Sequence, residues 1–290
     1  RFDYIYKFFS KNKYDPKDRK ANFGILDEGT LFVAKFSDDE TLEWLPIVFG
    51  EGPLTAANDF HSPADVLIET RRAADLLGAT PMDRPEDIEP NLVTGVVYCA
   101  LTNNSKRKKE QVNAVNPRVN NEHGHILEMI PPGGRGAEKD HTATKYTWDI
   151  LLLAGNPAKS EDGAKYHPAV GAGDWLSCPD NVAVDTKGRL WIATDGAPKF
   201  GIADGVWATD VEGAGRASVK LFFSTPRGAE MCGPAFNTDD TAFFCAVQHP
   251  GDEKGSTFAN PTTRWPDFED DQPVKPAVLV ITKQGGGAIG

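Results

Sequence analysis

Residues 181–196 read NVAVDTKGRLWIATDG, an apolar run, a turn signal at 185–188 and a second apolar run. This pattern predicts a β-hairpin. A similar unit, PAFNTDDTAFFCAVQHPG, occupies residues 234–251, with an Asp-rich turn between two apolar runs and a polar cluster at its end. Repeated hairpins of this kind are typical of propeller blades. The sequence therefore predicts an all-β protein built as a β-propeller, with a β-sandwich as the competing fold.

Most of the remaining chain also reads as short strands between turns. Strands are expected at 30–36, 42–48, 95–101 and 276–282. The exception is one short helix near residues 63–77, because Ser62 is a good N-cap, Pro63 suits the first helical position and Gly78 can end it. The chain starts at Arg1, without Met, in an aromatic run that reads as strand, so we expect a preceding region.

The composition limits the classes of partner. The formal net charge of −11 argues against binding nucleic acid or an anionic membrane surface, and it suits hard cations such as Ca²⁺. No apolar run approaches the ~18 residues of a membrane span, so stable membrane insertion is not expected. The four cysteines, Cys99, Cys178, Cys232 and Cys245, lack CxxC or zinc-type spacing. Cys99 and Cys245 are expected to be buried apolar residues, whereas Cys178 lies beside Asp180, where a metal role is the weaker alternative.

Two clusters combine groups that bind cations and phosphate. Arg84 and Glu86 are two residues apart, so an extended backbone points both to one side, where a carboxylate can hold a cation and a guanidinium a phosphate. Asp180 precedes one strand of a hairpin and Asp195 follows the other, so both can lie close enough to share a hard cation. The alternatives are a surface salt bridge and a pair of turn aspartates.

Two further clusters are weaker. His123 and His125 lie in an amide-rich loop, and loop hydrogen bonding competes with metal binding there. Glu230 and His249 flank the second hairpin, where ordinary loop polarity is the alternative. The chain contains no GxSxG, Walker or HExxH motif, so hydrolysis would depend on metal rather than on a serine nucleophile.

Taken in order, these clusters resemble the PhoX family of alkaline phosphatases. The stretches that carry the resemblance are EGPLTAANDFHSPADVLIETRRAADLLGATPMDRPEDIE, VYCALTNNSKR, NPRVNNEHGHI, CPDNVAVDTKGRLWIATDG, MCGPAFNTDD, VQHPG and PAVLVITKQGGGAIG. The MDRPE and PDN-to-TDG segments are the most specific. The resemblance covers residues 1–290 as one domain, the C-terminal portion of a propeller phosphatase.

The resemblance implies a six-bladed propeller, present here in part, that hydrolyses phosphomonoesters at a mixed cluster of Fe³⁺ and Ca²⁺ in its central channel. Arg84 and Arg189 would contact the substrate phosphate. The implied metal ligands are Glu86, Asp180, Asp195, Glu230 and His249.

The resemblance further implies a monomer, exported by the twin-arginine route to the periplasm or the medium. Family proteins are about twice this length, and their N-terminal half supplies more ligands, including a cysteine for iron. We therefore expect the complete protein to be active and this part alone to be inactive. Two alternatives stay open, a calcium-dependent propeller lactonase or esterase, and a calcium-stabilised binding propeller without catalysis.

Overall fold

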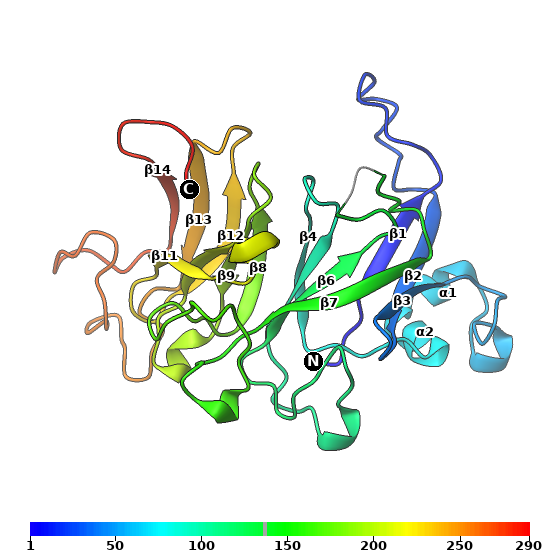
Figure 1. Ribbon diagram of the computed structural model, residues 1–290, viewed down its shortest axis with the longest axis horizontal. Helices are drawn as coiled ribbons and strands as arrows, with labels where there is room; N and C mark the ends of the chain where they lie inside the picture. The colour runs from blue at the N-terminus through cyan, green and yellow to red at the C-terminus, as the bar shows by residue number, and fades with distance from the viewer. Residues whose placement is uncertain (136–137) are drawn as a thin grey trace.

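The computed structural model describes residues 1–135 and 138–290 and consists mainly of antiparallel sheet (Figure 1). A seven-stranded sheet has the order β1-β2-β3-β7-β6-β5-β4, a four-stranded sheet the order β11-β10-β9-β8, and a three-stranded sheet the order β12-β13-β14. The strands are β1 Tyr6–Ser10, β2 Gly29–Phe36, β3 Thr41–Pro46, β4 Pro85–Pro90, β5 Val97–Leu101, β6 His125–Ile130, β7 Lys145–Leu153, β8 Pro179–Val184, β9 Leu190–Thr194, β10 Gly205–Thr209, β11 Lys220–Ser224, β12 Glu230–Phe236, β13 Ala242–Gln248 and β14 Ala277–Thr282.

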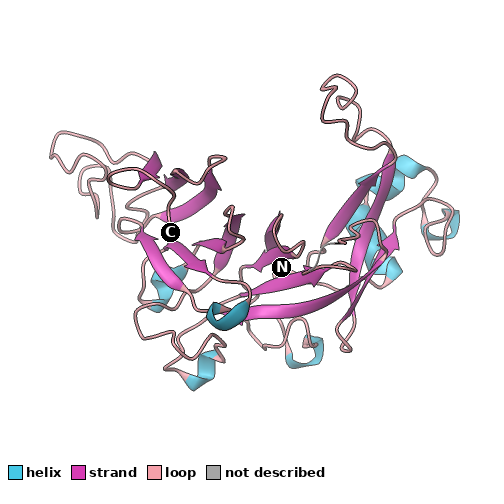
Figure 2. Cartoon of the chain, turned by 45° about the horizontal axis from the view of Figure 1, so that its top comes forward, coloured by secondary structure: helices cyan, strands magenta, loops and turns pink. Residues whose placement is uncertain are grey.

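Three consecutive meanders form blade-like units. Strands β4–β7 and β8–β11 each run up and down in sequence order, and β12–β14 form a third, three-stranded unit. The first strands of these units, β4, β8 and β12, pack side by side (Figure 1). The sheets follow one another along an arc (Figure 2). The prediction of a partial, propeller-like all-β fold is therefore confirmed.

Two short helices replace the single helix that the sequence predicts near 63–77. They are α1, Pro63–Ile68, and α2, Thr70–Leu77, separated by Glu69 with φ −98° and ψ 38°. The Ser62 side chain accepts a hydrogen bond from the Asp65 backbone N–H, and Gly78 ends α2 with φ 70°. Single turns of 3₁₀-helix cover Ala56–Asn58, Lys109–Gln111, Ser160–Asp162, Ala197–Phe200 and Gly213–Gly215. No helix in the described residues is long and apolar enough to cross a membrane.

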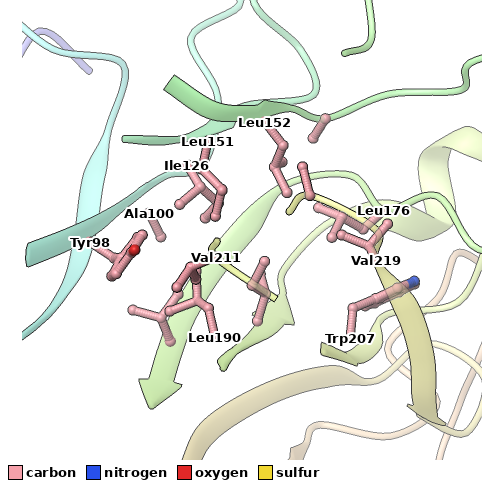
Figure 3. Close-up of a cluster of buried hydrophobic side chains, with 14 of the residues drawn as sticks. Tyr98, Ala100, Ile126, Leu151, Leu152, Leu176, Leu190, Trp207, Val211 and Val219 are labelled. Atoms are coloured by element: carbon pink, nitrogen blue, oxygen red, sulfur yellow. The ribbon is translucent and has the colours of Figure 1, made fainter. Parts of the chain in front are cut away.

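An apolar core joins the first two blade-like units (Figure 3). Tyr98, Ile126 and Leu152 contribute from β5, β6 and β7, and Leu190 and Trp207 contribute from β9 and β10. Burying such side chains contributes roughly 25 cal/mol per Å² of apolar surface. This interface fixes one unit against the next, and with it the relative position of β4 and β8.

Candidate active site

Strands β4 and β8 begin with the same local structure. Arg84 and Cys178 both have positive φ, 52° and 55°, and each is followed by a proline and then by an acid, Glu86 or Asp180. The strand register shifts between Pro85 and Ile88 in one case and between Pro179 and Val182 in the other. Because such bulges turn side chains away from the regular alternation, the two acids are presented at the strand ends.

Side-chain hydrogen bonds join β4, β8 and β12, the first strands of the three units, near the positions where these strands begin. Asp87 of β4 accepts a bond from the Val182 backbone N–H of β8 at 2.9 Å, and Asn181 of β8 accepts one from the Gly233 backbone N–H of β12 at 3.0 Å. Strand β12 carries its own register shift near Gly233. The starts of three consecutive units therefore meet, although they are far apart in sequence.

Arg84 and Glu86 form an ion pair at the start of β4. The guanidinium Nε and Nη2 atoms lie 3.0 and 2.8 Å from Glu86 Oε1. Both side chains are about one third exposed, so their remaining donors and acceptors can reach a bound ligand. The two side chains do lie together, but the backbone at Arg84 is left-handed, with φ 52°, and not extended as the sequence suggested.

Asp180 is the most buried acid of the group. The Thr102 hydroxyl donates a hydrogen bond to Asp180 Oδ1 at 3.0 Å. Burial, together with the negative charges of Glu86, Asp195 and Glu230, raises the pKa of Asp180 to about 6, while the Thr102 bond opposes the shift. Four carboxylates thus act on one another within a partly desolvated space, an arrangement that a hard cation would stabilise.

Asp195, Glu230 and His249 line one open cavity of about 230 Å³. His249 Nε2 lies 3.1 Å from Glu230 Oε2, and Gln248 donates to the same oxygen at 2.8 Å. Burial and the negative charge of Glu230 raise the pKa of Asp195, while the positive charges of Arg84 and His249 oppose this shift. Burial alone would lower the pKa of His249, but its bond to Glu230 and its backbone hydrogen bonds raise it.

Sequence reasoning missed two residues that support the site, Thr102 and Asp204. Buried Asp204 accepts hydrogen bonds from the backbone N–H groups of Gly196 and Ala197, each at 3.0 Å, and from the Thr194 hydroxyl at 2.6 Å. It thereby holds the turn that presents Asp195. The Asp204-Gly205 pair reads as an ordinary turn in sequence. The repeated RPED and CPDN segments were the available signal for the paired bulges.

Arg189 does not join these residues, which corrects the expectation that it would contact a phosphate beside Arg84. It precedes β9 whereas Asp195 follows it, so the five residues of an extended strand separate them, about 20 Å at 3.3 Å per residue. Its Nε atom lies 2.6 Å from Asp185 Oδ2, and it packs near Ile289. The hairpin turn therefore places Arg189 at the opposite end of the inner strands.

The two loop histidines also have structural partners. Buried His125 lies with Nδ1 3.2 Å from Asn121 and Nε2 3.0 Å from the Val115 carbonyl. His123 Nδ1 lies 2.9 Å from the Ser177 hydroxyl. Loop hydrogen bonding therefore accounts for their ring nitrogens, apart from His123 Nε2, which lies 3.3 Å from Asp162.

The donor set at the strand ends suits a hard cation. Glu86, Asp180, Asp195 and Glu230 provide carboxylate oxygens that repel one another electrostatically, and such oxygens are the ligands that Ca²⁺ prefers. Within residues 1–135 and 138–290, no three His, Cys, Asp or Glu side chains are spaced to hold a metal ion. The chemistry of these residues fits a cation, whereas they do not form a closed metal site.

Comparisons with known proteins identify the family and agree with the fold. Residues 1–251 match the family model described as alkaline phosphatase PhoX, and a comparison with curated proteins gives no match. The chain is similar to a solved structure described as Pseudomonas fluorescens PhoX in complex with vanadate, a transition state analogue, with a TM-score of 0.88 and 32% identity. That match covers all of this chain and 50% of the other, so the chain spans about half the length of its relative. The chain therefore belongs to the PhoX family of alkaline phosphatases.

Proposed function

We propose that this chain carries one part of the active site of a metal-dependent phosphomonoesterase, which releases inorganic phosphate from organic phosphate esters. The observation that supports it most is the meeting of one guanidinium and four carboxylates at the ends of β4, β8, β9 and β12. The PhoX relative, half of which this chain matches, is described in complex with vanadate, a transition state analogue. A site of the same class here would take a small phosphate ester.

Each group has a role in this proposal. Arg84, held by Glu86, donates N–H groups to the equatorial oxygens of the phosphoryl group and stabilises their charge. Bound Ca²⁺ and Fe³⁺ would neutralise the phosphate and activate the attacking oxygen. The residues proposed to hold these cations, together with ligands outside this chain, are Glu86, Asp180, Asp195, Glu230 and His249.

Three side-chain contacts hold two of these acids in position. The Thr102 hydroxyl orients Asp180, and His249 and Gln248 orient Glu230 through its Oε2 atom. With a cation held among these acids, the local field would be reversed, and a chain of net charge −11 could accept an anionic ester. We further propose a monomer that acts in the periplasm or outside the cell.

The test compares phosphatase activity and metal content in the complete gene product that contains this chain. Glu86→Gln should lower p-nitrophenyl phosphate hydrolysis at least about 100-fold and reduce bound metal, because it removes a ligand and the partner of Arg84. Glu89→Gln is the matched control, since Glu89 lies on the same strand near its other end. Full turnover by Glu86→Gln would remove this residue from the mechanism.

The same preparation separates the alternatives. Hydrolysis of a lactone but of no phosphate ester would indicate a propeller lactonase or esterase. Calcium binding without hydrolysis of either would indicate a binding propeller. Assaying this chain by itself would show whether its part of the site can act alone, and we propose that it cannot.

A further inference from the structure

The third blade-like unit has one strand fewer than the two units before it. Strands β4–β7 and β8–β11 are four-stranded meanders, whereas β12–β14 has three strands (Figure 1). Counted outward from β4, β8 and β12, the third strands of the units are β6, β10 and β14. Strand β6 pairs with β5 and β7, and β10 pairs with β9 and β11. Among the described residues, β14 pairs with β13 alone.

Strand β14 has the composition of an interior strand but lies at an edge. Its sequence AVLVIT contains no charged residue and no proline, the two devices by which edge strands commonly avoid pairing. Nearly all side chains of β6 and β10 are buried, whereas those of β14 alternate between exposed and partly buried. Val278 and Val280 are 74% and 59% exposed. The strand therefore suits a covered position that the described residues do not provide.

The outer edge of β14 offers a regular ladder of backbone groups. Its register with β13 runs without interruption from Ala277 to Thr282. Because successive residues of a strand direct their N–H and C=O groups to alternate sides, about half of these groups point away from β13. No backbone hydrogen bond joins this edge to another segment of residues 1–135 or 138–290. An unpaired apolar edge of this length accepts a further strand readily.

We propose that a strand of the same polypeptide, from outside residues 1–290, pairs antiparallel with β14 and completes the third unit. The first two units take their fourth strands, β7 and β11, from their own chain, and every pairing within the three sheets is antiparallel. The PhoX relative matches all of this chain with 50% of its own, so a protein of that size has an equal length of chain to supply the strand.

A strand on the same polypeptide is favoured over a second copy by its proximity. Tethering gives it a high effective concentration at the β14 edge, whereas a second copy must be recruited from solution. The inference concerns the completion of the fold and does not depend on the phosphatase proposal.

The test measures amide hydrogen exchange at single-residue resolution in the complete gene product. If β14 is paired on both sides, the consecutive amides from Val278 to Ile281 should all exchange slowly, at rates within about tenfold of those in β13. Strand β13 is the matched reference, since it lies in the same sheet and pairs with β12 on one side and β14 on the other. This measurement needs no substitution.

A free outer edge gives a different pattern. Every second amide of β14 would then face solvent and exchange at least about 100-fold faster than its neighbours, and that alternation would overturn the proposal. Light scattering on the same sample identifies the source of the strand. Slow exchange throughout β14 in a monomer is the expected result. Slow exchange confined to a dimer would assign the edge to a second copy and reject a strand of the same chain.

Paired proline variants give an independent measurement. Leu279→Pro and Val280→Pro each remove one N–H, and the N–H groups of neighbouring residues point to opposite sides of the strand. Both should lower the Tm of the complete product by at least about 3 °C beyond the controls Leu279→Ala and Val280→Ala, because both N–H groups are bonded. A proline variant that melts within about 1 °C of its alanine control would show that one side of β14 is unpaired, and would overturn the proposal.

Discussion

The two ends of the β8–β9 hairpin carry the same kinds of residue in opposite electrostatic settings. At the turn end, buried Asp185 accepts hydrogen bonds from Arg189 Nε at 2.6 Å, from Trp191 Nε1 at 2.9 Å and from two backbone N–H groups. At the open end, Asp180 has one described donor, Thr102, and is repelled by three other acids. Asp185 therefore stabilises the hairpin, whereas the charged form of Asp180 is destabilised by its surroundings.

This difference separates structural acids from functional ones. A buried carboxylate with a full set of donors contributes to folding, and its loss leaves those donors unpaired. A buried carboxylate among like charges is costly unless a cation binds there. We therefore expect the same Asp→Asn change to lower the free energy of unfolding at Asp185 and to raise it at Asp180.

The largest effect is expected at the turn end. Asp185→Asn should lower the free energy of unfolding by about 2–3 kcal/mol, because an amide cannot accept from both Arg189 and Trp191 while keeping its backbone bonds. Urea denaturation of this chain measures it.

The matched control is Asp239→Asn, in the Asp-rich turn of the next hairpin. Asp239 is exposed and its contacts are local, to Thr241, so this change should leave the unfolding curve within error of the parent. Equal losses for the two variants would mean that the partners of Asp185 contribute nothing specific.

The sequence predicted β2, β3, β5, β8, β9, β13 and β14, and the closeness of Asp180 to Asp195, because these features depend on local pattern. Apolar runs between turn signals located β8, β9 and β13 to within two residues, and hairpin geometry brought Asp180 and Asp195 to one end. Glu86, Glu230 and His249 lie at this end as the resemblance implied, although their chemical roles are still proposals.

The remaining features are non-local. Pairing of β3 with β7 joins segments about a hundred residues apart, and no periodicity specifies it. The left-handed backbone at Arg84 and Cys178 occurs in residues other than glycine, so composition gives no warning. Arg189 was placed wrongly because an arginine after an Asp-rich turn can pair with that turn, as it does with Asp185, instead of pointing along the strand.

His125 is a third buried titratable group, and its ring nitrogens keep both of their hydrogen bonds only when the ring is neutral. Burial lowers its pKa to about 4 from 6.5, with Asp83 opposing and Arg118 assisting. Its contribution to stability is therefore complete above pH 6.5 and is lost as the pH falls from 6.5 towards 4, because the unfolded chain takes up the proton first. Between pH 7 and pH 5 the free energy of unfolding should fall by about 2 kcal/mol through this group.

Urea denaturation at the two pH values tests this dependence. His125→Gln should flatten it, since glutamine can bond to Asn121 and Val115 without titrating. His61→Gln, at an exposed position, should keep the original dependence. The same slope in His125→Gln as in the parent would place the titrating group elsewhere.

The smallest effect, and the one of opposite sign, is expected at Asp180. In buffer containing a chelator, Asp180→Asn should raise the free energy of unfolding by about 1 kcal/mol, because the amide oxygen still accepts from Thr102 while the repulsion by Glu86, Asp195 and Glu230 disappears.

Thr102→Val is the companion change and should lower the free energy of unfolding, since it removes the donor and leaves the charge of Asp180. Added Ca²⁺ should stabilise the parent more than Asp180→Asn, because the cation offsets a repulsion that the variant no longer has. If Asp180→Asn instead destabilised the chain as much as Asp185→Asn, the two ends of the hairpin would be equivalent. The proposal that the acids at the open end form a cation site would then be wrong.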